Sequence, residues 1–299
     1  MYNMKLLYLI IVVLSACSVK AQSGSHFLKT NADENTLLWE VSGNGLTTSS
    51  YLLGTFHLLC KDDIHLSLSL KQAIANSAAI YLELDLDDPA TLFGSIKLMQ
   101  MKEGKTLKEL YTPEEFDRVS NYFIDSLKTP IGLFQTMKPA FLVALLYPKM
   151  MPCHTVSSVE EDIMALAKAD KKEIRGLETI AFQAALFNGI PYDKQAKELL
   201  NAIDSMEKSK IYFGLMLSAY KNQQLAEIEK IINDPEFGHV ENQSVLLDER
   251  NKNWVMQCHS IMKNEAVFIA VGAGHLIGKK GLIALLRAEG YQLRPLENK

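Results

Sequence analysis

The sequence predicts an α/β fold, with a central mixed β-sheet from the N- and C-terminal segments and a large helical insertion between them. Strand-like apolar segments gather at residues 37–85 and again at 266–295. The residues between them, about 90–264, are mainly helical in their apolar spacing. No tandem repeat of short period interrupts this order. One domain over residues 37–297, with a helical subdomain inside it, accounts for the pattern.

The first strands form a predicted hairpin. Residues 37–41 and 49–54 have strand character and flank Asn44-Gly45, a pair that strongly favours a tight turn. The elements expected next are a helix over residues 66–77 and a buried strand over 79–85. The chain therefore brings three strands into the sheet before the insertion begins.

Local signals also mark the helices of the insertion. Thr112, followed by Pro113 and two glutamates, predicts a helix start with a hydroxyl cap. Further helices are predicted from Pro139 to Pro148, from Ser157 or Ser158 to Ala169, and in succession over 179–263, with one short strand at 172–176. The last elements are a strand at 266–271, a helix at 281–288 ended by Gly290, and a strand at 291–295.

Composition limits the class of function. The chain has 299 residues, of which 48% are hydrophobic and 22% charged, as in an ordinary globular protein with a sizeable core. The net charge is -4, so no basic excess calls for a nucleic-acid partner. The sequence does not indicate an oligomeric state.

The N-terminus resembles an export signal. Lys5 precedes nine apolar residues, Leu6–Leu14, a run too short to span a bilayer but typical of a secretory signal. Leu14-Ser15-Ala16-Cys17 resembles a lipobox, in which Cys17 would carry the lipid, whereas Ala21 fits ordinary cleavage before Gln22. We expect a signal peptide over residues 1–21, a linker over 22–36, and an exported protein of the cell envelope, anchored to the membrane through Cys17.

Three cysteines remain if Cys17 is lipidated. An oxidising compartment permits one disulfide among them, and we pair Cys60 with Cys153. The alternative is three unpaired, buried thiols. Cys258 lies between methionines on a helical pattern and is expected to serve packing.

Two strand ends share one motif. Leu52–His57 and Ile269–His275 are apolar strands that each finish in Gly-x-x-His. Ligands of open α/β sheets bind at the carboxyl ends of strands, and glycine lets the chain turn sharply there. His57 and His275 can therefore meet at one centre. A strand-end histidine can also be a purely structural, hydrogen-bonded residue.

Glu83 is the third candidate. It lies inside the apolar strand 79–85, where a carboxylate is costly unless it is paired or bound to metal. Two imidazoles and one carboxylate are a ligand set for a divalent cation that leaves room for water. Alternatively, Glu83 pairs with Arg175 or Arg250.

The chain resembles the TraB/PrgY/GumN family, which is related to the TIKI Wnt-cleaving proteases. The resemblance runs from about Leu37 to Leu296. The segments that carry it are Leu38–Val41, Tyr51–His57, Leu82–Asp85, Gly176–Thr179 with Gln183, Arg250-Asn251 with Trp254, and Ala270–Leu276 with Gly278 and Gly281.

This resemblance implies a metal-dependent centre at His57, Glu83 and His275, holding zinc, manganese or cobalt. It also implies that Arg250 and Asn251 line the pocket. Arg250 can hold a substrate carboxylate or stabilise an oxyanion, or it can form a structural ion pair. Glu178 is a weaker candidate, because a carboxylate at a helix start can serve only as a cap.

We therefore expect a metal-dependent hydrolase, more narrowly a peptidase acting on a peptide or protein. Glu83 is either the third ligand or the general base, and the sequence leaves both open. The alternatives are a non-catalytic protein that captures a peptide or signal in the same crevice, and a structural envelope lipoprotein with a vestigial site. Nothing in the helical insertion indicates a specificity pocket.

Overall fold

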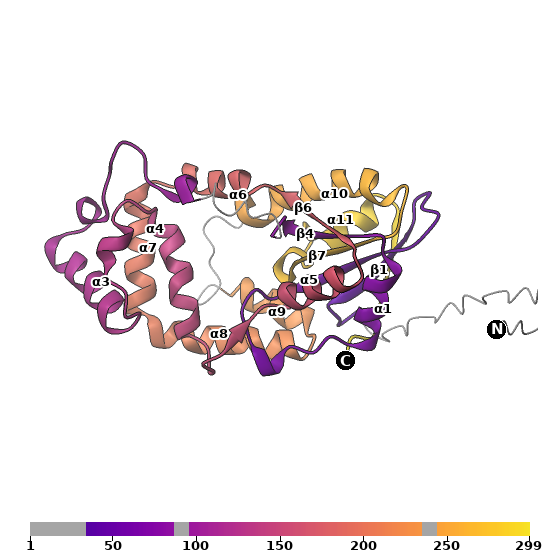
Figure 1. The fold of residues 1–299 in the computed structure, drawn as a ribbon, viewed down its shortest axis with the longest axis horizontal. Helices are drawn as coiled ribbons and strands as arrows, with labels where there is room; N and C mark the ends of the chain where they lie inside the picture. The colour runs from indigo at the N-terminus through magenta and orange to yellow at the C-terminus, as the bar shows by residue number, and fades with distance from the viewer. Residues whose placement is uncertain (1–33, 87–95, 235–243) are drawn as a thin grey trace, which may run out of the picture.

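The computed structural model describes residues 34–86, 96–234 and 244–299. The expected signal peptide, Cys17 and most of the expected linker lie outside these residues. Within the described chain, no helix is both long and apolar enough to cross a membrane. The α/β prediction is confirmed: a mixed six-stranded sheet is surrounded by helices (Figure 1).

The sheet has the strand order β6-β4-β7-β2-β1-β8. The strands are β1 (Leu38–Gly43), β2 (Ser50–Thr55), β4 (Ala79–Leu84), β6 (Glu173–Glu178), β7 (Val267–Gly272) and β8 (Tyr291–Pro295). β6, β4, β7 and β2 are parallel, and β1 pairs antiparallel with both β2 and β8. The predicted hairpin joins β1 and β2, with Asn44 and Gly45 at positive φ.

Because four neighbouring strands are parallel, their carboxyl ends meet at one edge of the sheet. In the β2–β7 register Thr55 lies opposite Gly272, so the two Gly-x-x-His turns leave the sheet side by side. The end of β4 lies next to β7, and the end of β6 next to β4. This edge is where the sequence places its candidate residues.

Helices cover the sheet on both sides (Figure 1). α10 (Glu249–Met262) and α11 (Leu282–Ala288) pack together on one side, while α1 (Leu68–Asn76) and α5 (Val159–Ala169) pack together on the other. Ser158 caps α5 by accepting a hydrogen bond from the Glu161 N–H, as one of the two predicted alternatives. The resulting core is dominated by fully buried residues of the sheet, such as Ile80 and Phe268.

The helical insertion builds a second core of its own. α3 (Pro113–Asp125), α4 (Pro139–Val143) and α7 (Tyr192–Asp204) pack around Phe123, Leu142 and Leu199, and form a separate lobe in Figure 1. The predicted capping box at Thr112 is present. α4 continues as a 3-10 helix, Ala144–Lys149, which contains Pro148.

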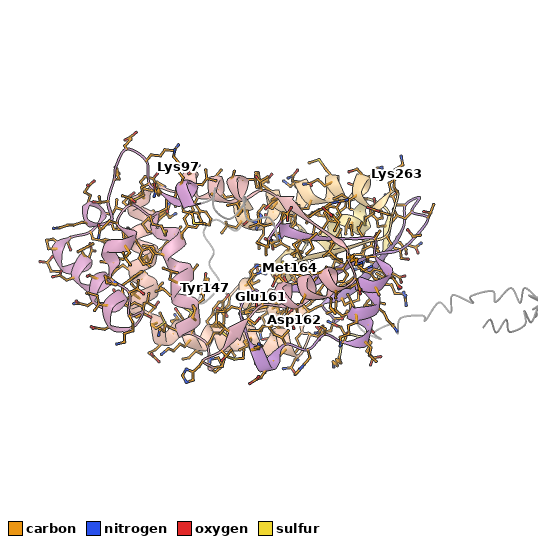
Figure 2. The ribbon with its side chains drawn as sticks, viewed as in Figure 1. Lys97, Tyr147, Glu161, Asp162, Met164 and Lys263 are labelled. Atoms are coloured by element: carbon orange, nitrogen blue, oxygen red, sulfur yellow. A yellow bond between two sulfur atoms is a disulfide. The ribbon has the colours of Figure 1, made fainter. Side chains whose placement is uncertain are left out.

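The two lobes are joined by several segments of the insertion. α6 (Ile180–Leu186) and α8 (Met206–Lys221) lead from one lobe to the other, and α9 (Leu225–Ile232) packs in the sheet lobe. The strand expected at 172–176 is β6, which joins the main sheet, so the range 90–264 is not wholly helical. Figure 2 shows Tyr147 at the margin of the helical lobe that faces the sheet lobe.

A short second sheet connects the turn after His57 to the start of α5. β3 (Leu59–Cys60) pairs with β5 (Val156–Ser157), and the predicted disulfide between Cys60 and Cys153 lies beside it. Among the described residues Cys258 is the free cysteine, and it is buried as expected of a packing residue. Burial raises the pKa of its thiol to about 12, so this thiol is unreactive.

Candidate active site

The two histidine turns depend on two glycines. A Cβ on Gly54 would stand 2.8 Å from a methyl carbon of Leu276 and 3.0 Å from the Ala273 Cα, so this glycine lets the turns pack against each other. A Cβ on Gly272 would stand 3.3 Å from Glu83 Oε1 and 3.4 Å from His57 Nε2. Gly272 therefore keeps open the space that the candidate groups share.

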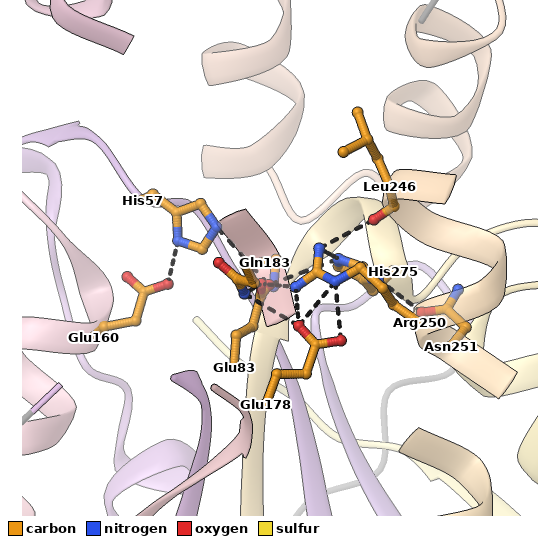
Figure 3. A network of polar contacts seen from close by, with 10 residues as sticks. His57, Glu83, Glu160, Glu178, Gln183, Leu246, Arg250, Asn251 and His275 are labelled. Atoms are coloured by element: carbon orange, nitrogen blue, oxygen red, sulfur yellow. Dashed lines mark hydrogen bonds and ion pairs between the residues drawn. The ribbon is translucent and has the colours of Figure 1, made fainter. Parts of the chain in front are cut away.

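Glu83 lies at the centre of the group (Figure 3). Its Oε1 accepts the backbone N–H of Gly272 at 2.8 Å, and lies 3.7 Å from His275 Nε2 and 3.9 Å from His57 Nε2. Burial opposes ionisation, but the charges of His275, Arg250 and His57 and the Gly272 hydrogen bond outweigh it, and the pKa of Glu83 falls to about 2. Glu83 is a carboxylate at neutral pH.

Glu160, the second residue of α5, holds the Nδ1 side of the His57 ring. The His57 Nδ1–H donates to Glu160 Oε1 at 2.6 Å, and the ring's Nε2 faces Glu83. The His57 side chain is 65% exposed, whereas that of Glu160 is 7% exposed. Desolvation alone would lower the pKa of His57, but the hydrogen bond and charge of Glu160, with the charge of Glu83, raise it to about 9.

His275 has the opposite environment. It is buried, its ring lies 4.4 Å from the Trp254 ring, and its Nδ1 lies 2.7 Å from Asn251 Oδ1. The Asn251 amide nitrogen donates to the Lys280 carbonyl, so Oδ1 accepts and the Nδ1 of His275 carries the proton. Desolvation, with the nearby charge of Arg250, lowers the pKa of His275 to about 4, although Glu83 opposes this.

Arg250 is fully engaged within the site. Its Nε donates to Glu178 at 3.0 Å, its Nη2 donates to Glu83 at 2.5 Å, and its Nη1 donates to the Leu246 carbonyl and to His275 Nε2. Nη2 also forms an ion pair with Glu178 at 2.9 Å. All three nitrogens of the guanidinium are therefore engaged within the protein. This is the structural ion pair, and the alternatives of binding a substrate carboxylate or an oxyanion require one of these bonds to open.

Several expectations about single residues change. Glu178 is not a helix cap: it ends β6, Thr179 caps α6 in its place, and the Glu178 side chain is 1% exposed against Arg250. Arg175 pairs with Tyr81 and Glu265, so of the two expected partners of Glu83 only Arg250 contacts it. Asn251 does not face Glu83 directly but orients His275.

Glu160 is the residue that sequence reasoning missed. It stands with Glu161 and Asp162 in the first turn of α5, where acidic residues are common because they favour the helix dipole. Only its burial and its contact with His57 distinguish it. Gln183 was noted only through the family resemblance, and its side-chain amide contacts both Glu83 and Glu178.

The chemistry of these donors fits a divalent cation. Each imidazole has its Nδ1 held by an outer partner and turns its Nε2 toward Glu83 Oε1, which is the usual arrangement of metal-binding histidines. The spacing is wide, since ligands around an ion with bonds of about 2.1 Å lie about 3.4 Å apart. In the described parts of the chain, no three His, Cys, Asp or Glu side chains form a group close enough to hold an ion. An ion at this point requires Arg250 to release His275 Nε2.

Comparison with known proteins finds relatives named as metalloproteases. The chain is 22% identical to a metalloprotease TIKI homolog from Amphimedon queenslandica, over 97% of the chain and 67% of the relative. It is 21% identical to metalloprotease TIKI1 of Danio rerio, over 91% of the chain and 65% of the relative. The chain thus spans about two thirds of the length of these relatives. No solved structure matches it.

The family match covers the whole site. A model described as the TraB/PrgY/gumN family matches residues 37–295, which include all strands of the main sheet and both histidine turns. The resemblance inferred from the sequence is therefore confirmed, and the chain belongs to the TraB/PrgY/gumN family.

Proposed function

We propose that the protein is a metal-dependent hydrolase, and more narrowly a peptidase, centred on His57, Glu83 and His275. The observation that carries the proposal is the convergence of two Nε2 atoms on Glu83 Oε1, with each Nδ1 fixed by an outer partner. Relatives named metalloprotease TIKI support the same reaction class. The substrate class is then a peptide or protein.

The three residues would hold the ion, which supplies a Lewis acid that polarises a carbonyl and acidifies a water molecule. Glu83 suits the ligand role better than the role of general base. Its Oε2 is occupied by Arg250 and Gln183, and its Oε1 is the oxygen that faces both histidines. A carboxylate whose pKa is about 2 is also a weak base near neutral pH.

The other residues keep this centre in place. Glu160 and Asn251 fix the orientation of the two imidazoles, and Trp254 covers the ring of His275. Arg250 balances the buried charges of Glu83 and Glu178. The exposed side of His57 leaves the centre open to a substrate from that direction. We assign catalysis to this centre and positioning to its outer partners.

The proposed location is the cell envelope, reached by export and kept by lipid on Cys17. The disulfide between Cys60 and Cys153 supports an oxidising compartment, because such bonds persist outside the cytoplasm. The signal pattern at residues 1–21 supports the same route. Anchoring is tested by a Cys17→Ser variant, which should move the protein from the membrane fraction to the soluble fraction.

A second candidate is a binding protein without catalysis, which captures a peptide or signal in the same crevice. The observation that favours it is the engagement of His275 Nε2 by Arg250 at 3.1 Å, which blocks a ligand position. In this case the polar network would be a rigid floor for a bound peptide. The third reading, a vestigial site, predicts neither metal nor peptide binding.

One experiment separates these functions. A form lacking residues 1–22 is analysed for bound metal and incubated with a peptide library, with and without chelator. Chelator-sensitive cleavage that is lost in His57→Ala and His275→Ala supports the hydrolase. An exposed histidine, His259, provides the control variant His259→Ala, which should change neither readout. Peptide binding without cleavage would favour the binding protein, and the hydrolase proposal would be abandoned.

A further inference from the structure

Two cavities meet at the proposed centre. One has a volume of about 330 Å³ and the other of about 290 Å³, and both are lined by His57 and Glu83. Larger cavities of about 380 and 690 Å³ lie elsewhere and are lined by none of His57, Glu83 and His275. Because they share His57 and Glu83, the two small cavities adjoin each other at the proposed centre.

The lining of the two cavities differs. The cavity of about 330 Å³, the aliphatic cavity, is lined by Leu82, Leu84, Leu86 and Ala270, with Ser158 and Gln183 among its polar residues. The cavity of about 290 Å³, the aromatic cavity, is lined by Phe56, Tyr147, Phe213 and Met216, with Leu247 and Ile228. Both therefore offer apolar walls that run up to a polar centre.

The aromatic cavity is a product of the helical insertion. Phe213 and Met216 come from α8, and Tyr147 comes from the 3-10 helix after α4. Phe56, the residue before His57, packs against Phe213 with ring centroids 5.5 Å apart, and Tyr147 stacks on Phe213 at 6.1 Å. These contacts bring an apolar wall from the other lobe to the His57 turn.

α8 is fastened to that turn, so the wall has a fixed position. The Tyr220 hydroxyl donates to the Gly54 carbonyl at 3.2 Å, and the Tyr220 ring lies 5.3 Å from the Phe56 ring. Gly54 and Phe56 belong to the motif that presents His57. The cavity wall and the proposed metal ligand are thereby held by the same four residues of chain.

The charges of the site indicate what the cavities accept. All three guanidinium nitrogens of Arg250 are engaged within the protein, and Glu83 and Glu178 form ion pairs with it. A charged substrate side chain would thus find no free counter-charge on Arg250. An uncharged, apolar side chain would instead displace water from aromatic and aliphatic walls, which is favourable.

We infer that the aromatic and aliphatic cavities are subsites for apolar side chains on either side of the bond that is cleaved, with bulky side chains in the aromatic cavity. This inference rests on the proposed peptidase function and names its substrate class. Cavities of about 300 Å³ lie at the lower limit for small-ligand sites, which suits one side chain and its backbone in each. The substrate is an extended segment with apolar residues flanking the cleaved bond.

The test alters the size of the aromatic cavity in both directions. Phe213→Ala enlarges it and Phe213→Trp narrows it, while Leu215→Ala removes an exposed apolar side chain from the same helix that lines neither cavity. Cleavage positions are mapped for each variant of the exported chain in a peptide library in which every residue type occurs on both sides of the cut.

We expect the unaltered protein to favour Phe, Leu or Met over Ala at one position by about 10- to 200-fold, the range that apolar pockets achieve. Phe213→Trp should shift this preference toward smaller residues. Phe213→Ala should shift it the other way, so that the largest residues are accepted better. Leu215→Ala should leave it unchanged. Opposite shifts in two variants of one residue cannot come from a general loss of folding, and thermal unfolding of each variant checks this.

The aliphatic cavity has its own variant. Leu86→Trp should reject bulky residues on the other side of the cut and leave the preference set by Phe213 unaltered.

Cleavage with the same preference in all variants overturns the inference while leaving the peptidase intact. If no peptide is cleaved, the proposed function fails. Binding of the same peptides, measured by fluorescence anisotropy, then shows whether the two cavities accept apolar side chains. Absence of any apolar preference in binding overturns the subsites too.

Discussion

The two Gly-x-x-His turns have the same pattern and neighbouring strands, yet their histidines lie in opposite surroundings. His57 is 65% exposed and donates to a carboxylate, Glu160, whereas His275 is 4% exposed, shares its Nδ1 proton with an amide, Asn251, and lies against Trp254. The pKa of His57 is raised to about 9 and that of His275 is lowered to about 4. A repeated motif fixes where a side chain starts, while the partner at Nδ1 and the degree of burial fix its charge.

The difference divides the site into an open half and a closed half. The closed half contains His275 and the Arg250 network, which is buried against α10 and β6. The open half contains His57, which is held by α5 and the small sheet. We expect the loss of buried charge in the closed half to cost the most stability, and the outer partners in both halves to affect metal binding.

The largest effect should come from Arg250→Met. This change leaves Glu83 and Glu178 as buried carboxylates without their cation, which costs about 3–5 kcal/mol of unfolding free energy. Urea denaturation measures the loss. The control is Arg118→Met, which breaks an exposed pair with Asp204 in the helical lobe and should cost at most about 1 kcal/mol. Equal losses of unfolding free energy in the two variants would contradict the division of the site into a closed half and an open half.

The disulfide should be the next largest contribution, and it belongs to the open half. Cys60 and Cys153 are separated by 93 residues of sequence, so their bond restricts a long loop in the unfolded chain. A double Cys60→Ser, Cys153→Ser variant should lose about 2–4 kcal/mol of stability. Because the bond holds the segment after His57 against the segment before Glu160, peptide binding should weaken as well. A variant with unchanged stability would show that the small sheet alone holds this region.

The outer partners of the two histidines provide a matched pair of smaller changes. Glu160→Gln and Asn251→Ala should each lower metal affinity by about 10- to 100-fold, because outer partners fix the orientation of metal-binding imidazoles. Isothermal titration with zinc or manganese measures the affinity. Glu161→Gln, in the same helix turn and exposed, is the control. If only one half responds, the two histidines are not ligands of one ion.

Local signals in the sequence predicted most of the fold. The hairpin, the strands and the Thr112 cap depend on spacing and residue type within short segments, and the structure contains them. His57, Glu83 and His275 were found for the same reason, since each ends or interrupts an apolar strand. The sheet topology then brings them together, as parallel strands require.

Contacts between distant segments could not be predicted in this way. Glu160 is 103 residues from His57 and resembles any acidic residue in a first helical turn. Glu178 looked like a helix cap because the sequence does not show that β6 continues to its position. Tyr147, Phe213 and Met216 line the aromatic cavity only because α8 and the 3-10 helix after α4 pack near the His57 turn. Each of these depends on where elements pack, which periodicity does not encode.

The smallest expected effect concerns the protonation of the two histidines. A pH titration of the metal-free protein measures the difference between their pKa values directly. Side-chain NMR of the histidines should show one imidazole that loses its proton near pH 9 and one that stays neutral until near pH 4. His57→Gln and His275→Gln assign the two signals. Glu160→Gln should return the pKa of His57 toward its ordinary value of 6.5.

The two histidines should also give stability opposite pH dependences. The pKa of His57 is higher in the folded state, so its contribution is complete below pH 6.5 and is lost as the pH rises through about 9. The pKa of His275 is lower in the folded state, so its contribution is complete above pH 6.5 and is lost as the pH falls through about 4. Comparing unfolding free energies of each variant with the parent at pH 5 and pH 9 separates the two. Parallel pH dependences would mean that the two turns share one environment, and the division into open and closed halves would be wrong.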